Sequence, residues 1–170
     1  MLARRAVAPS GRALQSFIAQ LAAPADRQPT LALNTGTLRR YRESVYHVLE
    51  QPELQTSYTV PLPGLVALPH GELRVSRCEE GGFSAAGEVR VAFRRDRPDV
   101  DERLLLRGHR RELSKLLQEA AVPPWERECY PLLVDDLGLA AIPGVACRDA
   151  GASMRLEKSR WQASWRPLVR

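Results

Sequence analysis

The sequence predicts an α+β protein, in which a small N-terminal piece of one helix and one hairpin is linked to a compact C-terminal domain of β-hairpins and one main helix. Two observations predict this class. Apolar residues recur at helical spacing near the N-terminus and once more in the second half, and between and after these segments they alternate as in strands. With 170 residues, 44% of them hydrophobic, the chain can form one ordinary domain or two small ones.

The N-terminal piece is expected to begin with a helix. Ser10 is a favourable N-cap, Pro24 ends the helix, and apolar residues follow helical spacing between them at Leu14, Phe17, Ile18 and Leu21. Residues 30–33 and 37–49 flank Asn34-Thr35-Gly36 and predict a strand, a turn and a second strand. One helix face and one hairpin are too little for a stable core, so this piece is interpreted as the end of a larger domain.

The chain changes character after the first fifty residues, where Pro61, Pro63 and Gly64 interrupt any periodicity. We therefore expect an N-terminal piece at residues 1–53, a linker at 54–64 and a C-terminal domain at 65–170.

In the C-terminal domain, apolar and polar residues alternate over 72–76 and 88–94, which predicts a hairpin with one charged face. Residues 109–122 carry an apolar stripe and predict the main helix, which Pro123-Pro124 stops. A second hairpin is expected over 132–142 and a last strand over 161–168.

The composition is basic and dominated by arginine. Lys and Arg number 25 against 20 acidic residues, for a net charge of +5, and because only Lys115 and Lys158 are lysines, 23 of these cations are arginines. A GC-rich genome alone would produce this bias. The alternative is polyanion binding, since the guanidinium group is suited to phosphate.

Several classes of protein are excluded by what the sequence lacks. No apolar run is long enough to cross a membrane, and no secretory signal is recognisable. Cys78, Cys129 and Cys147 are far apart and odd in number, which favours a reducing cytoplasm and argues against disulfides and zinc. There is no phosphate-binding loop, nucleophile motif or metal-ligand spacing, so no catalytic residue and no metal site is predicted. Gly81-Gly82 is interpreted as a turn.

Three basic clusters are candidates for phosphate contacts. On the predicted helix, Arg111 and Lys115 face away from the apolar stripe, and Arg107 precedes the helix, where the dipole favours an anion. A solvated helix face is the alternative interpretation. Tyr41 among arginines is typical of a surface that holds phosphates and stacks a base, although a packed strand residue fits equally well. The candidate residues in the clusters are Arg39, Arg40, Arg42, Arg94, Arg95, Arg107, Arg110, Arg111 and Lys115.

Residues 105–127, which contain the basic helix followed by Val122-Pro123-Pro124-Trp125-Glu126-Arg127, resemble the C-terminal domain of tRNA(Ile)-lysidine synthases. The resemblance continues through Tyr130-Pro131-Leu132-Leu133 and Ala141-Ile142-Pro143-Gly144. Residues 9–50 resemble the end of the substrate-binding middle domain of the same family. The resemblance is strong over 88–146 and moderate over 9–50, and it adds Arg127 to the candidate tRNA-binding residues.

The resemblance implies a function in tRNA modification. Enzymes of this family use ATP to adenylate the wobble cytidine of the CAU anticodon of a minor isoleucine tRNA, and lysine then displaces AMP. That chemistry belongs to an N-terminal domain with a Ser-Gly-Gly-x-Asp-Ser loop, which this sequence lacks. ATP, Mg²⁺ and lysine sites are therefore expected outside this chain, and the chain alone is expected to be inactive as a ligase.

By the same resemblance, the middle domain lies near the anticodon side of the tRNA and the C-terminal domain near the acceptor stem. The basic helix has only one lysine, Lys115, where family members often have several. This difference predicts weaker binding to tRNA. Two interpretations of the chain stay open. It is either a free-standing RNA- or protein-binding module, or a partial enzyme that works with a separately encoded catalytic domain.

Overall fold

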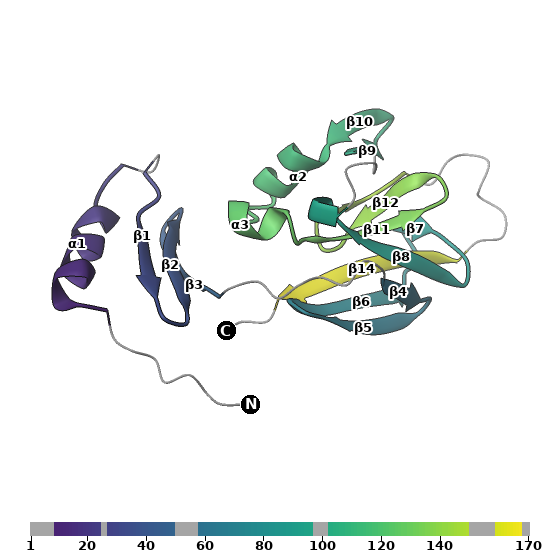
Figure 1. Cartoon of the computed structure of the whole chain (residues 1–170). Coiled ribbons are helices and arrows are strands. Elements are labelled where there is room, and N and C mark those ends of the chain that lie inside the picture. The colour runs from purple at the N-terminus through teal and green to yellow at the C-terminus, as the bar shows by residue number, and fades with distance from the viewer. Residues whose placement is uncertain (1–8, 25–26, 50–57, 97–101, 150–158, 168–170) are drawn as a thin grey trace. The chain divides into compact units, whose positions relative to one another are not determined.

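The computed structural model describes residues 9–24, 27–49, 58–96, 102–149 and 159–167. They fall into two compact units, one within Met1–Pro52 and the other within Glu53–Val169. We call these the N-terminal and the C-terminal unit. Helices and antiparallel sheets occur in separate stretches of the chain (Figure 1), which confirms the α+β class.

The N-terminal unit is one helix packed on a three-stranded sheet. Helix α1 (Gly11–Leu21) begins after Ser10, whose Oγ accepts the backbone N–H of Ala13 at 3.3 Å, as expected for an N-cap. Phe17 of α1 and Leu31 of the sheet form its buried core, at 4% and 7% exposure. The strands are β1 (Thr30–Leu33), β2 (Gly36–Tyr41) and β3 (Ser44–Val48), joined in the order β1-β2-β3.

The prediction of a single strand over residues 37–49 was wrong, because these residues contain most of β2 and all of β3. The chain turns back at Arg42, whose φ of 54° is left-handed, so that Tyr41 lies opposite Ser44. The N-terminal unit therefore has a second hairpin that the alternation of residues alone did not reveal.

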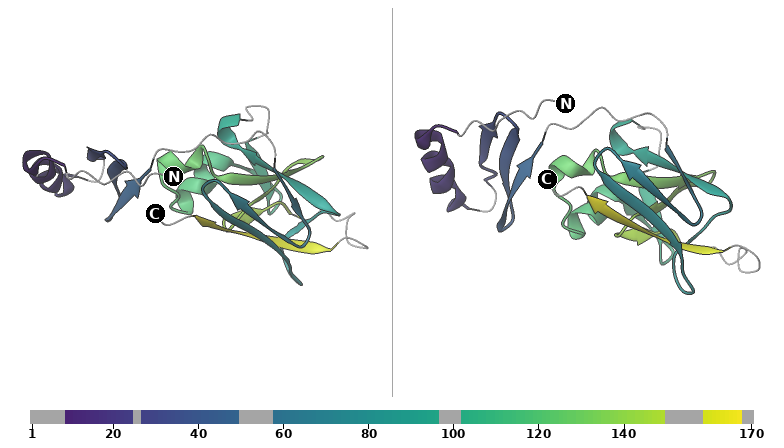
Figure 2. Two further views of the ribbon diagram at one scale, coloured as in Figure 1. Left: turned by 60° about the horizontal axis from the view of Figure 1, so that its bottom comes forward. Right: turned by 90° about the horizontal axis from the view of Figure 1, so that it is seen from below.

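The described part of the C-terminal unit contains two large antiparallel sheets and a separate two-stranded hairpin (Figures 1 and 2). The five-stranded sheet has the order β13-β12-β11-β8-β4 and the four-stranded sheet the order β5-β6-β14-β7. The bounds in the first sheet are β4 (Tyr58–Pro61), β8 (Glu88–Phe93), β11 (Pro131–Asp135), β12 (Gly138–Ile142) and β13 (Ala146–Cys147). Those in the second are β5 (Gly64–Leu68), β6 (Gly71–Arg77), β7 (Phe83–Ser84) and β14 (Arg160–Pro167).

The five-stranded sheet is the middle layer of this unit and is buried on both faces. Leu133 belongs to the core between the two sheets, whereas its neighbours Leu132 and Val134 belong to a second core. The second core is covered by α2 (Leu113–Glu119) and by the hairpin of β9 (Arg103–Leu106) and β10 (His109–Glu112). Burial on both faces explains why β11 is continuously apolar rather than alternating. Short elements complete the unit: the 3₁₀ turn η1 (Arg94–Asp96) and α3 (Pro124–Arg127).

The structure corrects the predicted linker. Tyr58–Pro61, inside the expected linker 54–64, is strand β4, which pairs with β8 and buries Val60 completely. Strand β5 begins at Gly64. Proline is tolerated at the end of an edge strand, so Pro61 interrupts the pattern without preventing the strand. Residues 54–57 of the expected linker lie outside the described residues.

The structure also corrects two predicted elements. Residues 109–112 are not helical but form β10, and the helix begins only at Leu113. Strands β6 and β8, expected to form one hairpin, lie in different sheets, because β6 pairs with β5 and β14. The hairpin expected over 132–142 is confirmed as β11–β12, and the last strand as β14.

Candidate nucleic-acid interface

The β9–β10 hairpin carries three exposed arginines, Arg103, Arg107 and Arg110. Its turn consists of Arg107 and Gly108, with φ of 50° and 77°, the pair of left-handed conformations that matches the twist of a two-residue hairpin. Glycine adopts this conformation without strain, which makes it suitable for the second turn position. Arg107 therefore stands at the tip of the hairpin and not, as the sequence suggested, at the start of a helix.

The two faces of the hairpin differ in chemistry. Leu104 points into the second core with no exposed surface, and Arg111 lies opposite it. On the other face, Arg110 lies opposite Leu105. The exposed arginines of that face and of the tip, which we call the hairpin arginines, are Arg103, Arg107 and Arg110. Glu112 is also exposed on that face, opposite Arg103.

Asp149 fixes the turn that carries these arginines. Its Oδ2 accepts the backbone N–H of Gly108 at 2.9 Å, and its own N–H donates to the carbonyl of Leu105 at 3.0 Å. The amides of Gly108 and Arg107 hold the pKa of Asp149 below its ordinary value. The preceding residue, Arg148, is itself anchored by an ion pair with Asp135, with Nη1 and Oδ1 3.0 Å apart. Asp149, which is 41 residues from Gly108 in the sequence, thus holds the turn in place.

Arg111 and Lys115 are largely neutralised by neighbouring carboxylates. Arg111 Nη2 lies 2.6 Å from Glu119 Oε1, and Lys115 Nζ lies 3.4 Å from Glu112 Oε2. Because Arg111 is on β10 and Lys115 on α2, the predicted stripe of like charges on one helix face does not exist. All four side chains are substantially exposed, so these pairs are weak, and a phosphate can compete for the cations.

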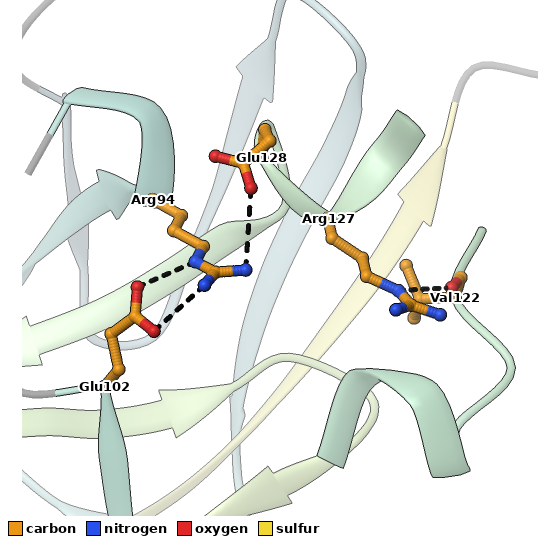
Figure 3. A network of polar contacts seen from close by, with 5 residues as sticks. All are labelled: Arg94, Glu102, Val122, Arg127 and Glu128. Atoms are coloured by element: carbon orange, nitrogen blue, oxygen red, sulfur yellow. Dashed lines mark hydrogen bonds and ion pairs between the residues drawn. The ribbon is translucent and has the colours of Figure 1, made fainter. Parts of the chain in front are cut away.

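Arg94 is engaged in ion pairs that hold the C-terminal unit together. Its Nε and Nη2 donate to the two carboxylate oxygens of Glu102 at 2.7 and 3.0 Å, and Nη1 lies 3.5 Å from Glu128 (Figure 3). The hydrogen bond to Glu102 raises the pKa of Arg94, against a smaller effect of burial. The bidentate pair connects η1 to the residue before β9, and the contact with Glu128 connects η1 to the end of α3.

Arg127 and Arg95 differ in their surroundings. The Nε of Arg127 donates to the carbonyl of Val122 at 2.9 Å, which stabilises the turn between α2 and α3 (Figure 3). Arg95 is exposed, and its backbone N–H donates to the carbonyl of Glu128. Of the two, Arg95 presents the more accessible charge.

In the N-terminal unit, Arg40 is a structural residue. Its guanidinium group donates four hydrogen bonds to backbone carbonyls at the end of α1 and the following turn, at 2.6 to 2.9 Å. The four carbonyls belong to Leu21, Ala23, Pro24 and Arg27. The carbonyl of Leu21 is in the last turn of α1, where carbonyls have no partner within the helix.

The opposite face of the same sheet carries the second basic surface. Arg39 and Tyr41 alternate with Arg40 along β2 and therefore point away from α1, and Tyr46 lies directly opposite Arg39. The guanidinium of Arg42 lies 5.6 Å from the centre of the Tyr41 ring. We call Arg39, Tyr41, Arg42 and Tyr46 the tyrosine face. It combines cations with aromatic rings, as the sequence predicted for Tyr41.

Sequence reasoning missed two residues of the interface. Arg103 was not among the candidates, because the run Arg103-Leu104-Leu105-Leu106 does not alternate and gives no local signal of which side chain is exposed. Asp149 was missed because it is 41 residues from Gly108, and no local pattern connects them.

The described residues contain no group of three or more His, Cys, Asp or Glu side chains that could hold a metal ion. A cavity of about 610 Å³ lies beside Arg77 and Trp161, and no carboxylate, imidazole or thiol is among its lining residues. Within the described ranges no helix is long and apolar enough to cross a membrane.

The Gly81-Gly82 turn is tightly packed at its second glycine. A Cβ on Gly82 would lie 2.5 Å from the carbonyl oxygen of Trp161 and 2.6 Å from Sγ of Cys78. The glycine therefore permits close packing within the protein.

Comparison with known proteins identifies both units. The family described as the TilS substrate C-terminal domain matches residues 89–165, and the family described as the TilS substrate binding domain matches residues 1–46. A crystal structure of a TilS C-terminal domain aligns with 64% of this chain and 97% of that chain, at 24% identity and a TM-score of 0.45.

Sequence relatives agree with these matches. The tRNA(Ile)-lysidine synthase of Methylococcus capsulatus is 34% identical over 143 residues, which are 77% of this chain and 32% of the relative. That of Yersinia pseudotuberculosis is 30% identical over 182 aligned positions, covering 94% of this chain and 38% of the relative. The chain thus spans about a third of the length of these relatives. It belongs to the tRNA(Ile)-lysidine synthase (TilS) family, of which it carries the substrate-binding and C-terminal parts.

Proposed function

We propose that this chain is the tRNA-recognition part of a tRNA(Ile)-lysidine synthase and that its partner is the minor isoleucine tRNA with a CAU anticodon. The observation that carries the proposal is the match of both units to domains that this family uses for substrate. Two basic surfaces support it, one exposed and one half-buried. Those surfaces are the hairpin arginines and the tyrosine face.

The geometry favours recognition of phosphates and shape. In A-form RNA the deep groove is inaccessible to side chains, so a protein contacts phosphates and the shallow minor groove. Arg103, Arg107 and Arg110 extend from one hairpin whose turn is fixed by Asp149, so little entropy of the backbone is lost when they bind. Such contacts position the tRNA without reading its bases.

The tyrosine face supplies a different chemistry. Unpaired bases in RNA loops stack on aromatic rings and on guanidinium planes. Tyr41 and Tyr46 lie on one face with Arg39, and Arg42 covers the Tyr41 ring. We infer that this surface contacts a single-stranded part of the tRNA, while the hairpin arginines contact a helical stem.

The ligase chemistry is assigned to a different polypeptide segment. We propose that ATP and Mg²⁺ are held by a catalytic domain encoded separately or elsewhere, because no described residue set here fits them. The proposed setting is the cytoplasm, where the tRNA substrate would be encountered.

Binding to two tRNAs tests the proposal. Fluorescence anisotropy of this chain with unmodified minor isoleucine tRNA and with elongator methionine tRNA, at two salt concentrations, gives both affinity and discrimination. We expect tighter binding to the isoleucine tRNA, with the difference retained at the higher salt because it does not depend on charge alone. Equal binding would identify a general RNA-binding module, and no binding would refute a role in tRNA recognition by this chain alone.

A further inference from the structure

An arginine occupies a core-facing position at one end of the four-stranded sheet. Leu73, Val75 and Arg77 alternate along β6, and the first two are buried in the core between the two sheets. Arg77 lies directly opposite Trp161 in the pairing of β6 with β14, and residues opposite each other in two paired strands share a face. The core-facing side of β6 therefore ends in an exposed cation.

Two contacts orient the guanidinium group of Arg77. Its Nη2 donates to Oγ of Ser159 at 2.7 Å, and its Cζ lies 5.8 Å from the centre of the Trp161 ring, where cation and ring attract each other. The indole is itself fixed, because its Nε1 donates to the carbonyl of Ala85 at 3.0 Å. A guanidinium has several N–H donors, and the bond to Ser159 uses one of them.

Arg77 lines the cavity of about 610 Å³, which lies where two connections pass from one sheet to the other. Residues 62–63 join β4 to β5, and residues 85–87 join β7 to β8. The backbone N–H of Leu62 donates to the carbonyl of Gly87 at 3.0 Å and links the two connections. A cavity of this size can hold a small molecule.

The lining of this cavity combines one cation with apolar walls. The walls are formed by Leu62, Pro63, Ala85, Ala86 and Trp161. Among the described lining residues there is no carboxylate, so no acid there opposes the charge of Arg77. A ligand that carries an anionic group on a planar, largely apolar body matches both parts of the lining.

We propose that this cavity is a nucleotide-binding site, in which Arg77 and Ser159 hold a phosphate and the apolar walls contact the base. Guanidinium groups bind phosphate through parallel hydrogen bonds, and bases stack on aromatic rings and guanidinium planes. The nucleotide is either an unpaired nucleotide of a bound tRNA or a free nucleoside monophosphate, which present the same chemistry. Because the described lining has no carboxylate to hold Mg²⁺, this is not a site for ATP chemistry.

Nuclear magnetic resonance of the full chain, without RNA, tests the site. The reporter is the indole N–H of Trp161, and Trp125→Phe and Trp165→Phe identify its signal among those of the three tryptophans. We expect ribonucleoside 5′-monophosphates to shift this signal saturably. They should bind about tenfold more tightly than inorganic phosphate or the uncharged nucleosides, because each of these makes only part of the contacts.

Two substitutions at exposed positions separate this site from a general effect of charge. Arg77→Gln removes the cation and Ala86→Phe fills the cavity, and each should weaken nucleotide binding about tenfold without changing the melting temperature appreciably. The control is Arg74→Gln, an exposed arginine on the same strand that pairs with Glu72 outside the lining, and it should leave binding unchanged.

Three results would overturn the proposal: no saturable shift of the Trp161 signal, equally tight binding of phosphate alone, or nucleotide binding that neither Arg77→Gln nor Ala86→Phe weakens. Competition then identifies the source of the nucleotide. Displacement by minor isoleucine tRNA assigns the cavity to an unpaired nucleotide of that tRNA, and undisturbed binding assigns it to a free nucleotide. Because nucleotide binding is measured without RNA, its failure is distinct from a failure of tRNA recognition, which the anisotropy experiment reports.

Discussion

Neutralising the hairpin arginines should change how salt affects tRNA binding. The variant Arg103→Gln/Arg107→Gln/Arg110→Gln removes three exposed cations that lie on one hairpin and point away from the core. Each phosphate contact in a duplex contributes about 0.9 to the slope of log K against log salt, so three contacts contribute about 2.7. Raising salt from about 50 to about 200 mM should then weaken wild-type binding about 40-fold more than binding of the variant.

The assay is anisotropy of labelled tRNA over a salt series, with a control of equal charge. Arg74→Gln/Arg90→Gln/Arg166→Gln removes three other exposed arginines, on β6, β8 and β14. If the control lowers the slope as much as the hairpin variant, or if the hairpin variant leaves the slope unchanged, binding depends on net charge or on another surface. Either result would refute the assignment of phosphate contacts to this hairpin.

Three further predictions concern the folded units. Arg40→Met removes four charge-assisted hydrogen bonds at the end of α1 and should lower the free energy of unfolding of the N-terminal unit by about 3 kcal/mol. Amide exchange of α1 measures this, and Arg42→Met at the exposed turn is the control with little expected effect. The pKa of Asp149 is lowered in the folded state, so its contribution to stability is present above the pKa of the unfolded chain and is lost as pH falls through the lower folded value. The stability difference between wild type and Asp149→Asn, measured by urea unfolding, should therefore shrink on acidification, and a constant difference would contradict this. Burial raises the pKa of Tyr130 to about 12, with a smaller effect of Glu126, so its contribution is lost as pH rises above the ordinary tyrosine value. Spectroscopic titration should show one late tyrosine that is absent in Tyr130→Phe, and four tyrosines titrating together would refute the burial argument.

Local patterns in the sequence were sufficient for the class of fold and for several elements. Helix α1 followed from a capping residue and helical spacing, and hairpin β11–β12 from apolar runs around Asp135-Asp136. The resemblance to the lysidine synthase family also came from contiguous motifs. In each case the pattern that predicts the element lies within one short stretch of the chain, so the sequence of that stretch is enough to recognise it.

The predicted helix at 109–122 shows where local patterns were insufficient. Arg111 fits the polar side of a helix as well as it fits a strand, so periodicity could not decide between the two structures. Residues 109–112 are a strand because they pair with 103–106 across the Arg107-Gly108 turn. That pairing also buries Leu104. The spacing of apolar residues around Leu104 does not predict its burial.

The sequence by itself determined that the protein is α+β, rich in arginine and related to a family of tRNA-modifying enzymes. Only the tertiary structure decided which arginines remain available to a ligand. Arg40 and Arg94 look like any other basic residue in the sequence, but one binds the carbonyls at the end of α1 and the other two carboxylates. The physical reason is that hydrogen bonds and ion pairs join residues that are distant in the chain, as Asp149 and Gly108 are. The availability of a charge is therefore a property of the folded protein.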